Sequence, residues 1–376
     1  LDNLKLRVGY GKTGNSAVSP YQTKGQLALR HYVFNNGSSE YIGYAPSVMA
    51  NDQLTWETTD QWNVGVDFGF LKNRINGTVE FYLQNTKDLL LKRQLPVVSG
   101  FSSVMSNVGS TRNKGIEITL NTRNIMNRNF TWSTDLTFSA NKEEIVELYN
   151  GKTDDVGNLW FIGQPIDVYY NYKKIGIWQN TENDLAEMAK FNEKGANFKP
   201  GSIRLEDVDG DYKITEEDKQ ILGSVRPKFV ASMVNNFEFK GFDLSVFLYA
   251  SVGGLLRNNI EFMEKPGRGN TVKVDYWTPT NPTNAFPRPS VDVEKLDYIS
   301  TLGYDKADFL RIRNITLGYT LPEMWSKKVL MDKIRIYLSA NNPAIFTNFT
   351  GIDPEGANGR TAPSYSTWMF GINLSM

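Results

Sequence analysis

A strict two-residue alternation of apolar and polar positions runs through the chain. One parity of the segment W-N-V-G-V-D-F-G-F holds only large apolar residues, Trp62, Val64, Val66, Phe68 and Phe70. The residues between them are small or polar. Because successive side chains of a strand face opposite sides, this segment is expected to be a strand with one apolar face and one small, polar face.

The same alternation recurs along the sequence and predicts ten strands. We expect them at 4–11, 53–71, 75–95, 107–123, 130–139, 228–239, 242–256, 308–321, 333–340 and 365–376. Short connections follow every second strand, and long connections follow the others. An apolar face toward lipid, a polar face toward the lumen, and alternating short periplasmic and long extracellular connections are typical of a transmembrane β-barrel.

The connection lengths also predict an orientation. The two longest connections, 148–227 and 258–307, are expected outside the cell, and the first contains helical and acidic pieces. Ten strands could close a small barrel. However, connections of this size favour the interpretation that residues 1–376 are part of a longer barrel wall. The fold class predicted is therefore all-β, a transmembrane antiparallel barrel with long extracellular loops.

Composition narrows the possible functions. Lys+Arg and Asp+Glu are equal at 41 each, so nothing in the net charge favours nucleic acid. Aromatic residues make up 12% of the chain, as expected for girdles at two membrane interfaces. No apolar run is long enough for a transmembrane helix. Cysteine is missing from the sequence and His31 is the single histidine, so we expect no enzyme.

Several motifs, taken together and in order, resemble one family. They are L-K-L-R-V-G-Y-G-K-T-G-N at 4–15, L-T-W-E-T-T-D-Q-W-N-V-G-V-D-F-G-F at 54–70, N-V-G-S-T-R-N-K-G-I-E at 107–117, G-Q-P-I-D-V-Y-Y at 163–170 and F-L-R-I-R-N-I-T-L-G-Y-T-L-P at 309–322. The chain resembles the C-terminal barrel portion of SusC-like (SusC/RagA-type) TonB-dependent transporters, which lie in the bacterial outer membrane of the Bacteroidota.

This resemblance implies a particular assembly. It implies a 22-strand barrel, of which this chain supplies about ten C-terminal strands, and a plug domain that is absent from this chain. It implies contact with TonB through the N-terminal part, a SusD-like surface lipoprotein over the barrel, and outer-membrane lipids around it. The function implied is TonB-dependent import of a bulky nutrient, with an oligosaccharide favoured over a peptide. The alternative is a surface β-sandwich that binds glycans or proteins without transport.

One acidic segment has the spacing of a calcium loop. In D-V-D-G-D-Y-K-I-T-E-E-D, carboxylates stand at positions 1, 3, 5 and 12 of an EF-hand-type loop, and positions 7 and 9 offer further oxygens. The predicted ligands of a structural Ca²⁺ are Asp207, Asp209, Asp211, Lys213 (backbone carbonyl), Thr215 and Asp218. Position 6 is Tyr212 where glycine is usual. The alternative is a solvated acidic turn that caps a short helix.

Aromatic and basic residues supply further candidates. Aromatic rings in the predicted outer loops could contact the substrate or the covering lipoprotein, and they could equally pack within the loops. The candidates are Trp160, Tyr169, Tyr170, Tyr172, Trp178 and Trp277. Arg311 and Arg313 share the lipid-facing parity of Ile315 and Leu317, so we expect them above the apolar band, near the outer rim or lipid phosphates. Trp62, Trp132 and Trp368 are expected to be interface anchors.

Overall fold

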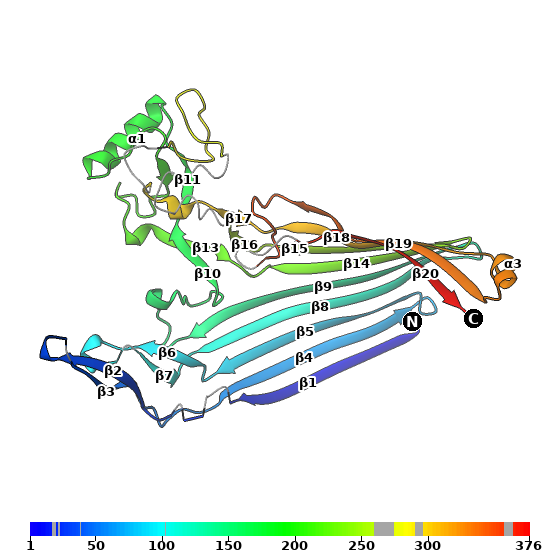
Figure 1. Cartoon of the computed structure of the whole chain (residues 1–376), viewed down its shortest axis with the longest axis horizontal. Helices are drawn as coiled ribbons and strands as arrows, with labels where there is room; N and C mark the ends of the chain where they lie inside the picture. Colours follow the sequence, from blue (N-terminus) through cyan, green and yellow to red (C-terminus); the bar gives the residue numbers. More distant parts are fainter. Residues whose placement is uncertain are drawn as a thin grey trace. The chain divides into compact units, whose positions relative to one another are not determined.

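The computed structural model describes residues 1–16, 20–21, 23–37, 39–101, 103–258, 274–289, 296–356 and 364–376. Ten strands form one sheet in the order β1-β4-β5-β8-β9-β14-β15-β18-β19-β20 (Figure 1). Their bounds are β1 (Asn3–Asn15), β4 (Glu57–Phe70), β5 (Ile75–Lys87), β8 (Ser110–Met126), β9 (Phe130–Glu147), β14 (Phe229–Phe239), β15 (Phe242–Val252), β18 (Phe309–Thr320), β19 (Lys333–Thr347) and β20 (Thr367–Ser375).

These strands confirm the ten that the alternation predicts, with one correction. The third predicted strand was expected to reach Leu95, but β5 ends at Lys87. Asp88 adopts a left-handed backbone conformation, with φ at 59°, which turns the chain out of the sheet. The residues that follow form β6 (Leu90–Gln94), which pairs with β7 (Ser103–Asn107) in a separate hairpin.

Short turns and long connections alternate as the sequence predicts. The ranges 71–74, 127–129, 240–241 and 321–332 join neighbouring strands at one end of the sheet. The long connections leave from the other end, and the first of them carries a hairpin of β2 (Gln26–Phe34) and β3 (Ser39–Val48). Transmembrane β-barrels have short periplasmic turns and long outer loops, so we expect the end with the long connections to be extracellular.

The chain divides into two compact units. The first comprises residues 1–123 and 135–166, and the second comprises residues 124–134 and 167–376. In the first unit the register of β1, β4, β5 and β8 runs without interruption, so each strand keeps one parity of side chains on each face.

The second unit contains β14, β15, β18, β19 and β20 together with most of the loop structure. The α-helices among its described residues are α1 (Glu182–Glu193) and α3 (Glu323–Ser326). Its small hairpins are β10 (Val168–Tyr172) with β13 (Lys219–Ser224), β11 (Lys174–Ile177) with β12 (Ile203–Leu205), and β16 (Leu255–Arg257) with β17 (Tyr304–Lys306). Among the described residues, no helix is long and apolar enough to cross a membrane.

The largest hydrophobic clusters of buried residues lie in the loop structure, not on the ten-stranded sheet. One joins Ile177, Ile203 and Leu205 to Trp277, and a second joins Trp178 to Met188 and Phe191 of α1. The predicted sandwich alternative would bury the apolar faces of two stacked sheets against each other. Instead, Val64 and Ile372 are 40% and 54% exposed in the sheet, so that alternative does not describe this chain.

Candidate functional site

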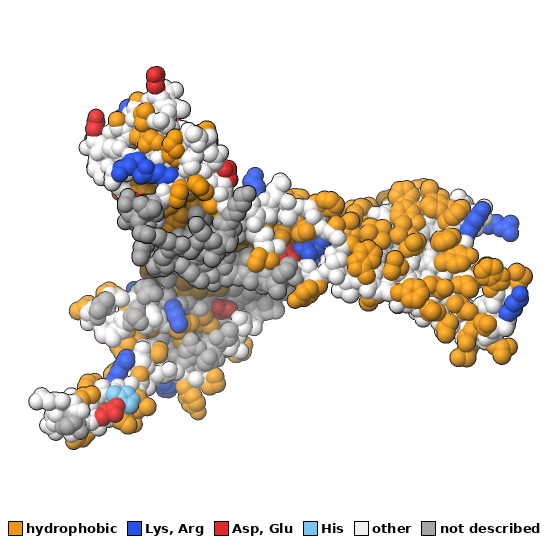
Figure 2. All heavy atoms as spheres, turned by 45° about the horizontal axis from the view of Figure 1, so that its top comes forward, with side chains coloured by type: hydrophobic (Ala, Val, Ile, Leu, Met, Phe, Trp, Pro, Cys, Tyr) orange, Lys and Arg blue, Asp and Glu red, His pale blue; other side chains and the backbone are white. Residues whose placement is uncertain are grey.

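The apolar face of the sheet is exposed in strands that have neighbours on both sides. Val64 of β4, Phe81 of β5 and Leu317 of β18 are 40%, 54% and 48% exposed. Hydrophobic side chains crowd the strands at the right of Figure 2. In water such a surface would be unfavourable, because burying apolar area contributes about 25 cal/mol per Å². Hydrocarbon chains of a membrane remove that penalty.

The height of this apolar face fits a bilayer. On β4 it extends from Trp62 to Phe70, about 27 Å along the strand at about 3.4 Å per residue. A strand tilt of about 40° reduces this to about 21 Å along the membrane normal, close to the apolar band of about 25 Å seen in outer-membrane barrels. At its extracellular edge, the rings of Tyr10 and Trp62 lie 4.8 Å apart, as expected for an aromatic girdle.

The opposite face of the sheet is polar and carries ion pairs between neighbouring strands. In the first unit Arg7 Nε donates to Asp67 Oδ2 at 3.0 Å, and Thr78 Oγ1 donates to Asp67 Oδ1 at 3.0 Å. In the second unit Arg335 Nε donates to Asp243 Oδ1 at 2.9 Å. Charged groups with these partners are stable on a wet inner surface and would be costly in lipid.

A polar residue, Asn235, stands among the apolar residues of the lipid-facing side of the second unit. Asn235 of β14 lies in register with Val246 of β15, which pairs in turn with Ile315, so its side chain is on the apolar face. Its carbonyl oxygen accepts hydrogen bonds from Trp132 Nε1 at 3.0 Å and from Thr134 Oγ1 at 2.7 Å. These bonds compensate for burial of the amide oxygen in an apolar medium, and they engage Trp132, which was expected to be an interface anchor.

The lipid-facing assignment of Arg311 and Arg313 is wrong, because β18 contains a bulge. Phe247 pairs with Asn314 but Leu248 pairs with Ile312, so Arg313 is an extra residue in the ladder. Beyond the bulge the parity reverses. Leu310 takes the outward position and is 41% exposed, whereas Arg311 is buried at 4%.

The bulge places Arg311 in a buried cluster of charges. Arg311 lies 2.7 Å from Asp353 Oδ1 and 2.7 Å from Glu355 Oε2, and Arg313 also pairs with Glu355. Asp353 Oδ2 accepts from Ser364 Oγ at 2.8 Å. Both ends of the connection between β19 and β20 are therefore fixed to the extracellular end of β18. Sequence parity does not reveal this cluster, because nothing in the alternation marks the extra residue.

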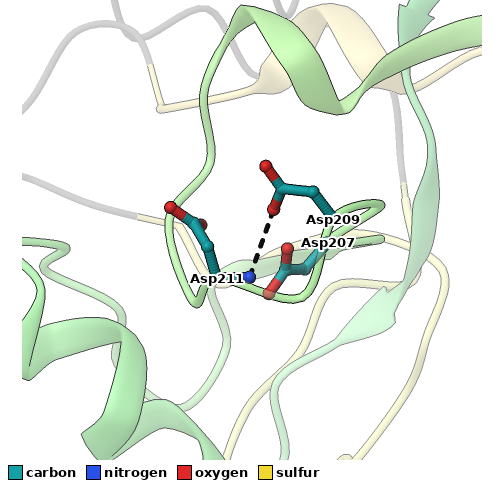
Figure 3. A group of neighbouring side chains, drawn as sticks. All are labelled: Asp207, Asp209 and Asp211. Atoms are coloured by element: carbon teal, nitrogen blue, oxygen red, sulfur yellow. Dashed lines mark hydrogen bonds between the residues drawn. The ribbon is translucent and has the colours of Figure 1, made fainter.

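Three of the predicted calcium ligands come together. The carboxylates of Asp207, Asp209 and Asp211 each place an oxygen within 4.8 Å of the others (Figure 3). Each also accepts a backbone N–H of the same loop, for example Tyr212 N to Asp207 Oδ2 at 2.9 Å. Tyr212 adopts φ at 61°, the conformation that favours glycine at position 6. Its ring packs 5.4 Å from that of Phe191, which favours this unusual position.

The remaining predicted ligands make hydrogen bonds within the same segment. Asp218 is fully buried, and its two oxygens accept from Val208 N at 2.8 Å and Thr215 N at 2.7 Å. With Thr215 it forms the capping box of a short 3₁₀ helix, Glu216–Asp218. Lys213 donates its backbone N–H to Asp211 Oδ1 at 2.7 Å. The helix cap that the sequence offered as an alternative is therefore present beside the three clustered carboxylates.

The six predicted aromatic contacts divide by burial. Trp178 and Trp277 are 1% and 5% exposed and form the core of the loop structure, so they have no surface to offer a substrate or a lipoprotein. Trp160 belongs to the first unit and is half-buried. The three tyrosines Tyr169, Tyr170 and Tyr172 are half-buried on β10.

The surroundings of Tyr172 are polar and partly desolvated. Burial, and then the nearby carboxylate of Glu216, raise the pKa of Tyr172 to about 12. Its hydroxyl donates to Glu216 Oε1 at 3.3 Å, and Lys219 Nζ lies 5.2 Å from the ring centroid. Lys219 in turn lowers the pKa of Glu216 through a side-chain hydrogen bond. Tyr172 is thus a hydrogen-bonded structural residue with part of its ring still accessible.

Comparison with known proteins identifies the class. The family model "TonB dependent receptor-like, beta-barrel" matches residues 1–342. TonB-dependent receptor P3 of Formosa agariphila is 32% identical over 98% of this chain, and TonB-dependent receptor SusC of Bacteroides thetaiotaomicron is 31% identical over 100% of it. A solved structure of the RagAB peptide transporter superposes with a TM-score of 0.77 at 25% identity, covering 99% of this chain and 40% of that one.

The chain therefore belongs to the TonB-dependent receptor-like β-barrel family. The predicted resemblance to SusC and RagA, the barrel fold and the outer-membrane location are confirmed. The chain spans 39% of the length of receptor P3 and 38% of that of SusC.

Proposed function

We propose that this protein takes part in TonB-dependent import of a bulky nutrient, an oligosaccharide or a peptide, across the outer membrane. The chain forms part of the barrel wall and its outer loops. The observation that carries the proposal is the contrast between the two faces of one sheet. The apolar face is exposed in interior strands, whereas the other face carries ion pairs such as Arg7–Asp67. Such a wall closes every backbone hydrogen bond in lipid and keeps the lumen wet.

The proposal includes partners outside this chain. A SusD-like lipoprotein would cover the extracellular end, and TonB would act through the N-terminal part of the protein. The support is the similarity to SusC and to the RagAB peptide transporter. In this role the chain itself carries out no covalent chemistry.

Growth of a deletion strain tests the proposed import. We expect loss of growth on one oligosaccharide or peptide mixture as the sole carbon source, and restoration by the intact gene. A strain without functional TonB should show the same loss, because import depends on that energy source. Unchanged growth on every candidate nutrient in the deletion strain would contradict the proposal.

We also propose that the carboxylates of Asp207, Asp209 and Asp211 hold a structural Ca²⁺. Three carboxylates within 4.8 Å repel one another, and a hard divalent cation with oxygen ligands offsets that repulsion. Lys213 Nζ lies 4.0 Å from Asp211 Oδ2, so a weak ion pair partly neutralises one of them. A bound ion would hold the loop that precedes the 3₁₀ helix in one conformation.

Terbium luminescence on the full-length transporter tests this site. Replacing Asp209→Asn and Asp211→Asn together should weaken Tb³⁺ and Ca²⁺ binding at least about tenfold, because affinity follows the number of charged ligands. The matched control, Glu182→Gln with Glu193→Gln, removes the same charge from the ends of α1 and should leave binding unchanged. Equal affinity in both double variants would show that the acidic turn is only a helix cap.

A further inference from the structure

A continuous polar row crosses the outer face of the first unit just beyond the aromatic girdle. Lys12 of β1 pairs in register with Asp60 of β4, Asp60 with Asn85 of β5, and Asn85 with Arg112 of β8. The preceding row toward the membrane centre is Tyr10, Trp62, Leu83 and Lys114. The register is uninterrupted, so all these positions share the lipid-facing parity.

Side-chain contacts agree with this placement. Tyr10, whose ring lies beside Trp62, donates its hydroxyl to Asp60 Oδ1 at 2.9 Å. Arg112 Nε donates to Asn85 Oδ1 at 3.0 Å. Adjacent rows lie about 7 Å apart along a strand, or about 5 Å along the membrane normal. The polar row therefore lies at the depth of lipid headgroups, directly above the girdle that marks the edge of the hydrocarbon.

Positive charges outnumber negative charges in the polar row and the rows next to it. Lys12, Lys87 and Lys114 are exposed, and in the described part of the chain none of them has an acidic partner within 4.0 Å. The two acids nearby are engaged. Asp60 accepts from Tyr10, and Glu144 pairs with Arg112 and with Lys142 at 3.5 Å each. We call Lys12, Lys87 and Lys114 the lysine collar.

The opposite end of the same strands has a different character. Its outward row joins Leu4, Phe68, Gly77 and Leu120 in register, and the next joins Phe70, Ile75 and Thr122. These described rows contain no lysine or arginine. On the outward face of these four strands, the lysines therefore lie toward the extracellular edge of the membrane band.

We propose that the lysine collar binds the phosphate groups of an anionic lipid in the outer leaflet. Three observations favour a lipid as the occupant. The lysines stand on the face that contacts lipid, they begin at the level of the girdle, and the two outward rows at the periplasmic end of the same strands hold no lysine or arginine. Ammonium groups on flexible stems can reach headgroup phosphates while their methylene groups contact the acyl chains. The contact would fix the depth of this part of the wall.

Titration of the full-length transporter with a phosphorylated lipid tests the proposal. The protein, in an uncharged detergent, is titrated with bisphosphorylated lipid A and with the same lipid after removal of its phosphates. The triple variant Lys12→Gln, Lys87→Gln, Lys114→Gln should bind the bisphosphorylated lipid at least about tenfold more weakly than the unmodified protein. The dephosphorylated lipid should bind both proteins equally weakly.

Two further variants separate specific binding from charge loss and from misfolding. Lys5→Gln, Lys72→Gln, Lys333→Gln removes the same charge from inward-facing and periplasmic positions and should keep the original affinity. Lys12→Arg, Lys87→Arg, Lys114→Arg should also keep it. A collar glutamine variant that migrates as a folded barrel and retains full affinity would overturn the proposal. So would equal losses in the collar and control variants, or equal binding of both lipids by the unmodified protein.

Discussion

The buried side chain of Arg311 joins the extracellular end of β18 to the connection that follows β19. Its guanidinium contacts Asp353 and Glu355 in a site from which water is largely excluded. Burial by itself would raise the pKa of Asp353. Hydrogen bonds from the backbone N–H of Glu355 and from Ser364, together with the charge of Arg311, outweigh this effect and hold the pKa of Asp353 below its usual range.

This pKa shift makes the connection sensitive to acid. Because the folded carboxyl has a lowered pKa, the unfolded state binds more protons near pH 4 and below. The stabilisation is complete at neutral pH and is lost as the pH falls through the lowered pKa. We expect hydrogen exchange at residues 353–356 to accelerate as the pH falls below about 4, beyond the intrinsic pH dependence of exchange.

Variants at this site check the assignment. Arg311→Ala leaves two carboxylates without their buried partner and should lower the local opening free energy by about 3–5 kcal/mol. Asp353→Asn should remove the acid-dependent step itself. Glu323→Gln, at the exposed start of α3 at the other end of the sheet, should change neither quantity. An acid-dependent step of the same size in Asp353→Asn would assign it to another group.

The bulge in β18 decides which face each residue of that element occupies. On the side of the bulge toward the short turns, Ile315 and Leu317 point outward. On the side toward the long connections, Leu310 takes the outward position. One added residue reverses every side chain beyond it, because the side-chain period of a strand is two. Because of the bulge, β18 presents apolar residues to lipid on both sides of Arg313. The bulge also places Arg311 on the inner face of the strand.

Deletion of Arg313 tests this role of the bulge. Without the extra residue, the register would turn Arg311 toward the outer face and Leu310 inward, or force the strand to slip. We expect the deletion variant to assemble poorly in the outer membrane and to lose the heat-dependent mobility shift of a folded barrel. Deletion of Lys152, in an exposed turn, serves as the matched control. Normal assembly without Arg313 would mean that the ladder tolerates either parity.

For the whole molecule, the medium around the sheet matters more than any single contact. Interior strands leave Val64, Phe81 and Leu338 at 40%, 54% and 46% exposure, so the folded state needs an apolar solvent. The loop structure differs, because Trp178 and Trp277 are buried in clusters of its own. The extracellular part of the second unit thus has the packing of a water-soluble domain.

A charge on the outer face should expose this dependence. Val79→Arg, at the position paired with Val66 in the middle of the apolar band, places a cation there and should destabilise the full-length transporter in lipid vesicles by about 2–4 kcal/mol. Thr119→Arg, on the inner face of β8, should cost less than about 1 kcal/mol because water hydrates it. Urea unfolding monitored by tryptophan fluorescence measures both. Equal destabilisation would mean that the two faces have the same surroundings.

Sequence alternation determined most of the wall. The ten strands, their neighbours and the lipid-facing parity follow from a period of two, because a strand that crosses a bilayer must keep one face apolar over its whole length. The spacing of Asp207, Asp209 and Asp211 likewise brought three carboxylates together, since they lie within one short loop. The local sequence pattern is sufficient to predict a structural feature when the interacting residues are near each other in sequence or recur at a regular spacing.

Tertiary structure decided the rest. The reversal at Arg313 and the pairing of Arg311 with Asp353 depend on register between strands, and no feature of the sequence marks the extra residue. The sequence does not distinguish Trp178 and Trp277 from Tyr169 and Tyr172, because all four are aromatic residues of predicted outer loops. Packing of α1 and the small hairpins buries the two tryptophans. Burial and ladder register arise from contacts between residues far apart in the chain, so a local pattern does not contain them.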